Sequence, residues 1–190
     1  MNLFTLILLG ATLFFAYQIY LHVSQLEDPQ DDAIEYEDND EEDIAVLIED
    51  ADRAYEEGDY PKTVALLRDA LIKDTNNTEV LNKLGFVLAK EERYDEALEA
   101  YTESLQLDNK DDTVHNALAS LYRSLKRYDE AQRHYERALE IDDCYAITYF
   151  NYANLLLDME DKERARDMYV KAIECDPDFT QAKFELEKLG

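Results

Sequence analysis

Residues 78–179 repeat one pattern every 34 residues, with no insertion between copies. Each copy holds a large apolar residue followed by a small one, and later an alanine and a tyrosine four positions apart. The large-small pairs are Leu84-Gly85, Leu118-Ala119 and Tyr152-Ala153, and the alanine-tyrosine pairs are Ala97/Tyr101, Ala131/Tyr135 and Ala165/Tyr169. A fixed period of this length indicates stacked supersecondary units rather than a globular domain around one central site. The repeat therefore favours a binding surface over an enzyme.

The apolar spacing within each copy predicts two helices. In residues 78–111, Leu81, Leu84 and Leu88 share one helical face. Residues 91–93 form a polar turn, and the apolar spacing resumes over residues 94–105. Because the small side chains let two backbones approach closely, we expect each copy to be a tightly packed helical hairpin.

This pattern resembles the tetratricopeptide repeat family, whose unit is a 34-residue helix-turn-helix. The resemblance implies an all-α solenoid, preceded by the N-terminal segments described below. Its four units are residues 44–77, 78–111, 112–145 and 146–179, here called units one to four. Residues 180–190 are expected to form a capping helix, because an end unit needs a partner with a polar outer face. Ala182, Leu186 and Leu189 can pack on unit four.

The sequence departs from the family pattern in a few places. Unit one carries Asp50, Ala54 and Thr63 where Leu, Tyr and Ala are usual. Only unit four ends in the family's proline, Pro177. The turn glycine is kept at Gly58 and is replaced in the later units by Glu92, Lys126 and Glu160.

Residues 3–23 contain no Asp, Glu, Lys or Arg and are long enough to span a bilayer as a helix. Tyr17 and Tyr20 lie near the end of this run, as interfacial aromatic residues do. We therefore expect residues 1–24 to be an uncleaved transmembrane anchor. A cleaved signal peptide is the main alternative, although no basic residue precedes the run and no small-residue cleavage site follows it. A buried helix is a third interpretation.

The orientation of such an anchor depends on the Lys and Arg residues near its ends. None occurs before Arg53. This absence favours a single-pass membrane protein with an extracytoplasmic repeat domain, on the periplasmic side of the inner membrane if the source is a bacterium.

Residues 25–43 are expected to be an unfolded acidic linker, since 11 of the 17 residues from 27 to 43 are acidic and none is basic. The linker could act as a spacer, or it could fold back onto basic groove residues and mask them. Calcium binding is disfavoured, because the run lacks the glycine spacing of an EF-hand. The chain as a whole carries a net charge of −26, which argues against nucleic acid and favours basic partners.

No arrangement of side chains indicates catalysis, a metal site or a cofactor. The chain has no His/Cys ligand spacing and no glycine-rich phosphate loop. Cys175 takes a core position of the repeat, and Cys144 lies in the turn between units three and four. Their positions in the repeat are neighbouring, and a disulfide between them is left open if the domain is exported.

The family resemblance implies that the first helices of successive units line a concave groove for partner segments. Asparagine amides can pair with an extended peptide backbone, basic residues can receive carboxylates, and phenylalanines can anchor apolar side chains. The candidate groove residues are Asn82, Lys83, Phe86, Lys90, Asn116, Ser120, Arg123, Phe150, Asn151 and Asn154. The carboxylate clamp of chaperone-binding members, with paired Lys, two Asn and Arg, is not reproduced in register.

These observations predict a membrane-anchored scaffold or adaptor that binds protein or peptide partners and is not an enzyme. Family analogy suggests the assembly of envelope or membrane complexes. Two alternatives remain: a structural module that self-associates head to tail, and a regulatory subunit of a membrane enzyme.

Overall fold

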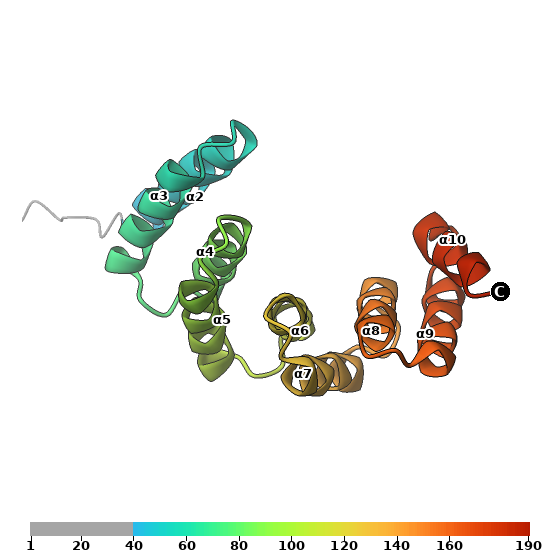
Figure 1. Ribbon diagram of the computed structural model, residues 1–190. Helices are drawn as coiled ribbons and strands as arrows, with labels where there is room; N and C mark the ends of the chain where they lie inside the picture. The colour runs from blue at the N-terminus through green and yellow to red at the C-terminus, as the bar shows by residue number, and fades with distance from the viewer. Residues whose placement is uncertain (1–39) are drawn as a thin grey trace, which may run out of the picture. The chain divides into compact units, whose positions relative to one another are not determined.

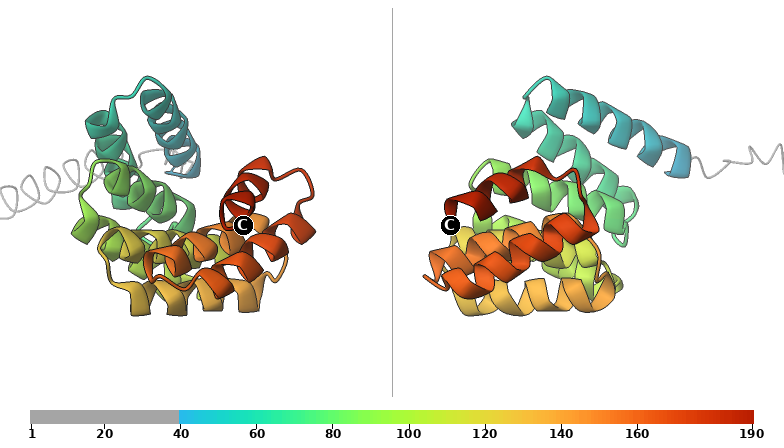
Figure 2. Two further views of the ribbon diagram at one scale, coloured as in Figure 1. Left: turned by 45° about the vertical axis from the view of Figure 1, so that its right-hand side comes forward. Right: turned by 90° about the vertical axis from the view of Figure 1, so that its right-hand side faces the viewer.

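The computed structural model describes residues 40–190, and this part of the chain is helical throughout, with no strand (Figure 1). Its helices are α2 (Asp40–Glu56), α3 (Tyr60–Lys73), α4 (Thr78–Lys90), α5 (Tyr94–Leu107), α6 (Asp112–Ser124), α7 (Tyr128–Ile141), α8 (Ala146–Asp158), α9 (Lys162–Cys175) and α10 (Thr180–Lys188). Consecutive helices pack as pairs, α2 with α3 through to α8 with α9. The pairs stack in chain order, which is the arrangement of an α-solenoid (Figure 2).

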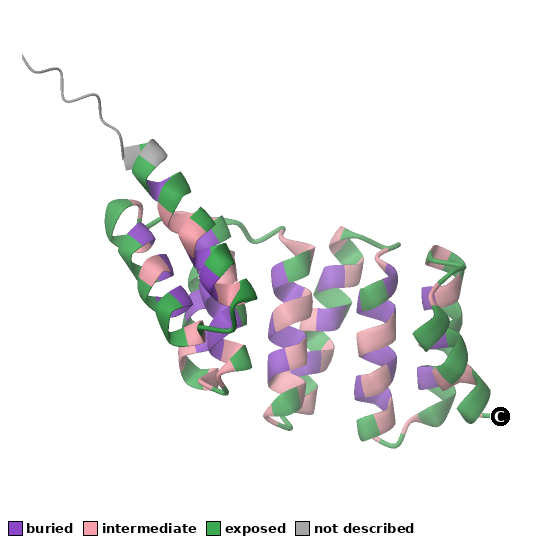
Figure 3. Cartoon of the chain, turned by 90° about the horizontal axis from the view of Figure 1, so that it is seen from above, coloured by how far each residue is buried: buried purple, intermediate pink, exposed green. Residues whose placement is uncertain are grey.

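One side of the stack is built from the first helix of each pair. Helix α6 contacts both α4 and α8, so these three helices form a continuous surface. The second helices join neighbouring pairs, because α5 packs on α6 and α7 packs on α8. Buried residues lie between the helices and exposed residues on the outer turns (Figure 3). The surface of α4, α6 and α8 is called the concave surface below.

Three tyrosines form the centre of the packing within units two to four. Tyr101 is 4% exposed, and Tyr135 and Tyr169 are completely buried. In unit two the ring of Tyr101 lies against Gly85, where an added Cβ would come within 2.9 Å of the ring carbons. The repeating large-small pairs of the sequence therefore mark the places where a tyrosine ring meets the facing helix.

The turns inside the four units share one backbone conformation. Gly58 has a φ of 80°, and Glu92, Lys126 and Glu160 have φ values of 60°, 59° and 64°. This left-handed region is unstrained for glycine and costs other residues about 1–2 kcal/mol. Units two to four, which lack the family's glycine, therefore keep the left-handed turn at a higher backbone energy than unit one.

Helix α2 begins at Asp40, so the predicted linker at residues 25–43 was too long at its C-terminal end. Ile44 is buried at 8% exposure, and Lys73 forms an ion pair of 2.8 Å with Asp43. Acidic residues are favourable at a helix N-terminus, because they interact with the positive end of the helix dipole. The acidic composition that suggested disorder therefore also suits a first helical turn.

Residues 1–39 lie outside the described part of the chain, and with them the predicted anchor at residues 3–23 and most of the linker. Within residues 40–190, no helix combines the length and apolar character needed to cross a membrane.

Helix α10 packs on α9 at the end of the solenoid. Ala182 is fully buried there, and Leu186 and Leu189 are partly buried in the same cluster. The opposite face carries charged residues and Phe184, which is 58% exposed. Arg166 donates hydrogen bonds of 2.8 Å to the carbonyl oxygens of Leu189 and Gly190, which fixes the end of the chain to α9.

Candidate binding surface

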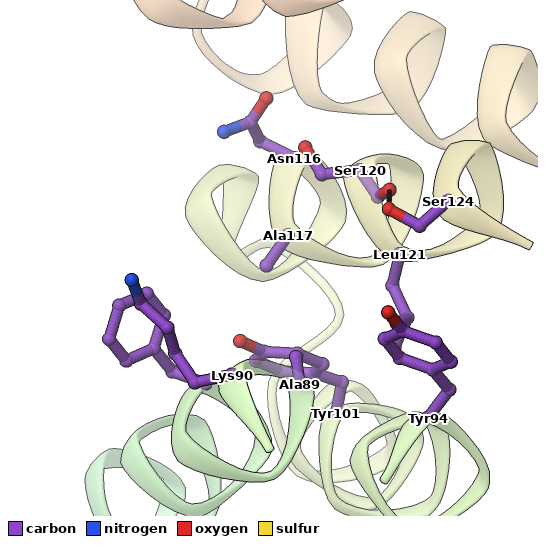
Figure 4. A pocket seen from close by; sticks show the side chains of 10 residues that line it. Ala89, Lys90, Tyr94, Tyr101, Asn116, Ala117, Ser120, Leu121 and Ser124 are labelled. Carbon is purple, nitrogen blue, oxygen red and sulfur yellow. Dashed lines mark hydrogen bonds between the residues drawn. The ribbon is translucent and has the colours of Figure 1, made fainter. Parts of the chain in front are cut away.

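A pocket of about 440 Å³ lies between α4, α5 and α6 (Figure 4). Its apolar lining comes from both helices of unit two and from the first helix of unit three. The lining residues are Phe86, Ala89, Lys90, Tyr94, Tyr101, Asn116, Ala117, Ser120, Leu121 and Ser124. This pocket, called the unit two–three pocket below, opens on the concave surface between two neighbouring units.

Two polar groups of the pocket lack partners among residues 40–190. Lys90 is exposed and forms no ion pair or hydrogen bond there. The Tyr101 hydroxyl also forms no hydrogen bond within this part of the chain, and burial raises the pKa of Tyr101 well above its ordinary value. The pocket therefore offers an ammonium group and a neutral hydroxyl donor beside an apolar wall.

The free hydroxyl has a clear cause in the sequence. In unit three, Tyr135 and Ser120 are 3.0 Å apart, hydroxyl to hydroxyl. In unit four, the Tyr169 hydroxyl donates to Oδ1 of Asn154 over 2.5 Å. The equivalent position in unit two is Phe86, which has no polar atom, so Tyr101 has no partner on its neighbouring helix.

The other predicted basic residues of the groove are already paired. Lys83 binds Asp52 of unit one, with Nζ 2.7 Å from Oδ1. Arg123 binds Asp158 of unit four, with Nε 2.6 Å from Oδ2. Both ion pairs bridge neighbouring units and are partly exposed, so each contributes at most about 1 kcal/mol. Lys90 is thus the predicted groove cation that the described residues leave unpaired.

The predicted asparagines also bond between or within units. Asn82 donates to Asp111 over 3.1 Å, and Asp111 in turn accepts a hydrogen bond from the backbone of Val114 at the start of α6. Asn151 donates to the side-chain oxygen of Asn116 over 3.3 Å. Their amides hold the units together in addition to facing the groove.

The two predicted phenylalanines differ in their surroundings. Phe86 is 47% exposed and lines the unit two–three pocket as well as a smaller one of about 210 Å³ beside Lys83 and Tyr55. Phe150 packs between Tyr169 and Phe179, with ring centroids 5.6 Å and 5.0 Å away. The Phe86 ring has one aromatic neighbour, Tyr55, with ring centroids 5.7 Å apart, and its exposed face is available to a ligand. Phe150 instead packs against two rings at the carboxyl end of unit four.

The structure brings four of the ten predicted groove residues into one pocket: Phe86, Lys90, Asn116 and Ser120. The other six lie outside that pocket: Asn82 and Lys83 on α4, Arg123 on α6, and Phe150, Asn151 and Asn154 on α8. Tyr94 and Tyr101 also line it, although neither was among the predicted groove residues. Comparing equivalent positions could have found Tyr101, since Phe86 removes the partner that Ser120 and Asn154 provide elsewhere.

A histidine pair lies inside unit three. His115 on α6 and His134 on α7 are 3.0 Å apart, Nδ1 to Nδ1. Burial, followed by the neighbouring His115 and Arg133, lowers the pKa of His134 to about 4. Residues 40–190 contain no group of three or more His, Cys, Asp or Glu side chains that could hold a metal ion. The pair is best explained as two uncharged imidazole rings that pack between α6 and α7.

The helix pairs, their stacking and the shared turn conformation can now be compared with known proteins. A tetratricopeptide repeat model matches residues 76–143 and 110–178, which together cover more than half of the chain. The chain belongs to the tetratricopeptide repeat family. Proteins of this family mediate protein–protein interactions. Comparison with curated proteins gives no match.

Several solved structures share the fold. The crystal structure of MamA is 23% identical, with a TM-score of 0.66 over 73% of this chain and 81% of that one. PilF of Pseudomonas aeruginosa is 21% identical, with a TM-score of 0.72 over 80% and 69%. The first tetratricopeptide domain of Spaghetti (RPAP3), bound to the HSP90 peptide SRMEEVD, is 26% identical, with a TM-score of 0.57 over 61% and 92%.

Proposed function

We propose that this protein is a membrane-anchored scaffold that binds segments of partner proteins on its concave surface, centred on the unit two–three pocket. The observation that carries this proposal is the exposed Phe86 beside two polar groups that have no partner within residues 40–190, the Lys90 ammonium and the Tyr101 hydroxyl. Exposed apolar surface next to unused hydrogen-bond donors is costly for a free protein and favourable once a ligand covers it. No catalytic step is part of the proposal.

The pocket chemistry suggests a partner segment with one apolar side chain and one nearby acceptor, either a carboxylate or a backbone carbonyl. Ser120, Ser124 and Asn116 can bond to an extended backbone at the rim. The Spaghetti domain, bound to the HSP90 peptide SRMEEVD, is an example of a similar fold that binds an acidic segment. Within residues 40–190, Lys90 is the one cation that lines the pocket and it has no partner there, so we propose a single-carboxylate contact rather than a full clamp.

The membrane part of the proposal depends on residues 3–23. Their length and lack of charge support a single-pass anchor, and the absence of Lys and Arg before Arg53 supports an extracytoplasmic repeat domain. The acidic residues that follow would then hold the repeats away from anionic lipid headgroups. Anchoring raises the local concentration of the binding surface near membrane partners, which suits an assembly factor.

The test is a crosslinking pull-down of the full-length protein from its native membrane. We compare wild type with Phe86→Ala and Lys90→Glu, and with two matched controls outside the concave surface, Phe184→Ala and Lys162→Glu. Both control residues are exposed, and the Lys162 side chain forms no hydrogen bond or ion pair within residues 40–190. We expect partners to be lost from the two pocket variants and kept by the controls.

An unchanged partner list in the pocket variants would reject the pocket and move binding to the outer helices, the acidic segment or the anchor. Recovery of tagged and untagged copies of this chain as the only crosslinked pair would favour the self-associating module instead. The asparagines are poorer probes, because Asn82→Ala would also remove the bond to Asp111 at the start of α6.

A further inference from the structure

Two thiols from different parts of the repeat meet at the carboxyl end of the solenoid. Cys144 lies in the loop between α7 and α8, and Cys175 is the last residue of α9. Their sulfur atoms are 2.8 Å apart although 31 positions separate the residues in the chain. A disulfide bond is about 2.05 Å long, so a small side-chain rotation brings the two sulfurs to bonding distance.

The backbone around both cysteines is held by other contacts. The amide of Cys144 donates to Oδ1 of Asp142 over 2.9 Å, which closes the loop. The Tyr149 hydroxyl donates to the carbonyl oxygen of Asp143 over 3.0 Å and ties the same loop to α8. At Cys175, the regular end of α9 is capped by Asp176, whose amide bonds to Ala172. The repeat fold itself therefore sets the distance between the thiols.

We propose that Cys144 and Cys175 form a reversible disulfide that closes unit four into a covalent loop. The bond would connect the turn before α8, at the end of unit three, to the last residue of α9, with α8 and α9 inside the loop. The equivalent positions at the preceding junction are Lys110 and Ile141, so this device is specific to the carboxyl end. The proposal is independent of the unit two–three pocket.

The oxidant required is a small-molecule disulfide, as found outside the reducing cytosol. Cys144 is exposed and Cys175 is partly buried, so the Cys144 thiolate attacks first and expels one small thiolate. Cys175 then loses its proton to solvent and attacks the Cys144 sulfur, expelling the second thiolate. The protein loses two electrons and two protons, and the small disulfide becomes two thiols. Burial, the bond to Cys144 and nearby acidic residues raise the pKa of Cys175 to about 11, which favours this order.

The charge around the pair predicts which oxidant reacts faster. Asp142, Asp143, Glu174 and Asp176 adjoin the two cysteines in the chain. A dicationic disulfide such as cystamine is attracted to this site, whereas the anionic glutathione disulfide is repelled. We expect the rate ratio to favour cystamine at low ionic strength and to shrink as salt screens the charges.

The experiment uses full-length protein in mild detergent, titrated with each oxidant and then mapped by proteolysis and mass spectrometry. The expected product is monomeric protein containing a Cys144–Cys175 peptide. Cys144→Ser and Cys175→Ser should each give only a mixed disulfide on the remaining thiol. Dimers linked through Cys144, or wild-type protein with two mixed disulfides and no internal bond, would overturn the proposal.

A second measurement tests the consequence for the fold. Closing this loop should slow hydrogen exchange in α8, α9 and α10 and raise the thermal midpoint of wild type by about 5–10 °C on oxidation. The same treatment should leave Cys144→Ser unshifted. Equal midpoints for oxidised and reduced wild type, with the internal bond shown by mass spectrometry, would reject the stabilising role.

Discussion

Units two and four share the same helix-turn-helix fold, but their concave surfaces differ in how far the protein's own residues cover them and satisfy their hydrogen bonds. In unit two, Phe86 is 47% exposed and the facing Tyr101 hydroxyl has no partner in residues 40–190. In unit four, Asn154 takes the position of Phe86 and accepts a hydrogen bond from Tyr169. The concave Phe150 of unit four is covered by Phe179. Phe86 in unit two, in place of Asn154 in unit four, therefore leaves a tyrosine hydroxyl that a ligand can bind. In unit four the protein supplies the hydrogen-bond partner itself.

The difference has an energetic reason. A hydrogen bond between two side chains contributes about 1 kcal/mol to stability, and a donor left without a partner costs more as it becomes buried. Units three and four gain that bond inside the fold. Unit two forgoes it and keeps Tyr101 at the wall of a pocket, where a ligand can supply the acceptor. Stability and binding thus compete at one position of the repeat.

Replacing each of the two phenylalanines by alanine should give the largest difference between a residue that stabilises the fold and a residue that binds a partner. We expect Phe150→Ala to lower the free energy of unfolding by about 2–3 kcal/mol, because the ring packs against Tyr169 and Phe179. Phe86→Ala should cost less than about 1 kcal/mol while reducing partner recovery, since its ring is half exposed. Urea unfolding of the full-length variants followed by circular dichroism measures both. Equal costs would mean that the two surfaces do not differ as described.

Acid should weaken unit three in particular. The positions of His115 and His134 are held by Leu81 and Ala100 in unit two and by Tyr149 and Met168 in unit four, so unit three has a titratable pair where its neighbours do not. The folded pKa of His134 is about 4, below the ordinary value of 6.5. Stability is therefore complete above the unfolded pKa and is lost as pH falls from about 6.5 towards about 4.

We expect a loss of roughly 1–2 kcal/mol between about pH 7 and about pH 5, after allowing for solvent screening of the partly exposed ring. Arg133 and Arg137 lie nearby and oppose protonation, whereas Asp111 and Asp112 favour it. Glu96 does not contribute to the change in stability over this pH range, because its hydrogen bond with Arg93 holds its pKa near 2. The control is His134→Ala, the residue of unit two, which should flatten the unfolding profile over this range. A wild-type profile that is already flat contradicts the assignment.

Removing single hydroxyls tests the tyrosine comparison directly. Tyr135→Phe and Tyr169→Phe should each cost about 1 kcal/mol, because Ser120 and Asn154 lose their partner. Tyr101→Phe should be close to neutral for stability, because no bond is lost within the described chain, and should weaken partner binding. Thermal unfolding combined with the pull-down gives both values. A stability loss for Tyr101→Phe as large as for the other two would show that the hydroxyl is already satisfied.

The repeat period predicted the solenoid because each unit carries the same local signals, and those signals determine local packing. The small residues Gly85, Ala119 and Ala153 marked where tyrosine rings meet the facing helix. The start of α2 was missed by four residues, because an acidic run suits both disorder and a first helical turn.

The candidate site was predicted less completely than the fold. Residue type identifies which side chains face the groove, but not which of them are paired across units. Lys83 and Arg123 looked as available as Lys90, and their partners Asp52 and Asp158 lie 31 and 35 positions away. The distance between Cys144 and Cys175 was likewise undetermined, since it depends on how a loop meets the end of a helix.

The turns provide the smallest comparison, between unit one and the other three. Gly58, Glu92, Lys126 and Glu160 all adopt a positive φ, and only Gly58 does so without strain. An added Cβ at Gly58 would meet no atom within 4 Å, so any effect there comes from the backbone alone. Left-handed geometry costs a non-glycine residue about 1–2 kcal/mol. A glycine avoids this cost, but its larger loss of conformational entropy on folding offsets part of the stabilisation.

We therefore expect Glu92→Gly, Lys126→Gly and Glu160→Gly each to stabilise the protein by about 0.5–1 kcal/mol, and Gly58→Ala to destabilise it by a similar amount. Urea midpoints of the full-length variants provide the measurement, and Glu57→Gly, one position before the left-handed residue, is the control. A gain from Glu57→Gly as large as from Glu92→Gly would show that chain flexibility, rather than relief of backbone strain, sets the effect. If only the three turn positions gain, the family's glycine is explained by backbone energy, and its loss in units two to four has lowered stability while preserving the turn that positions the concave helices.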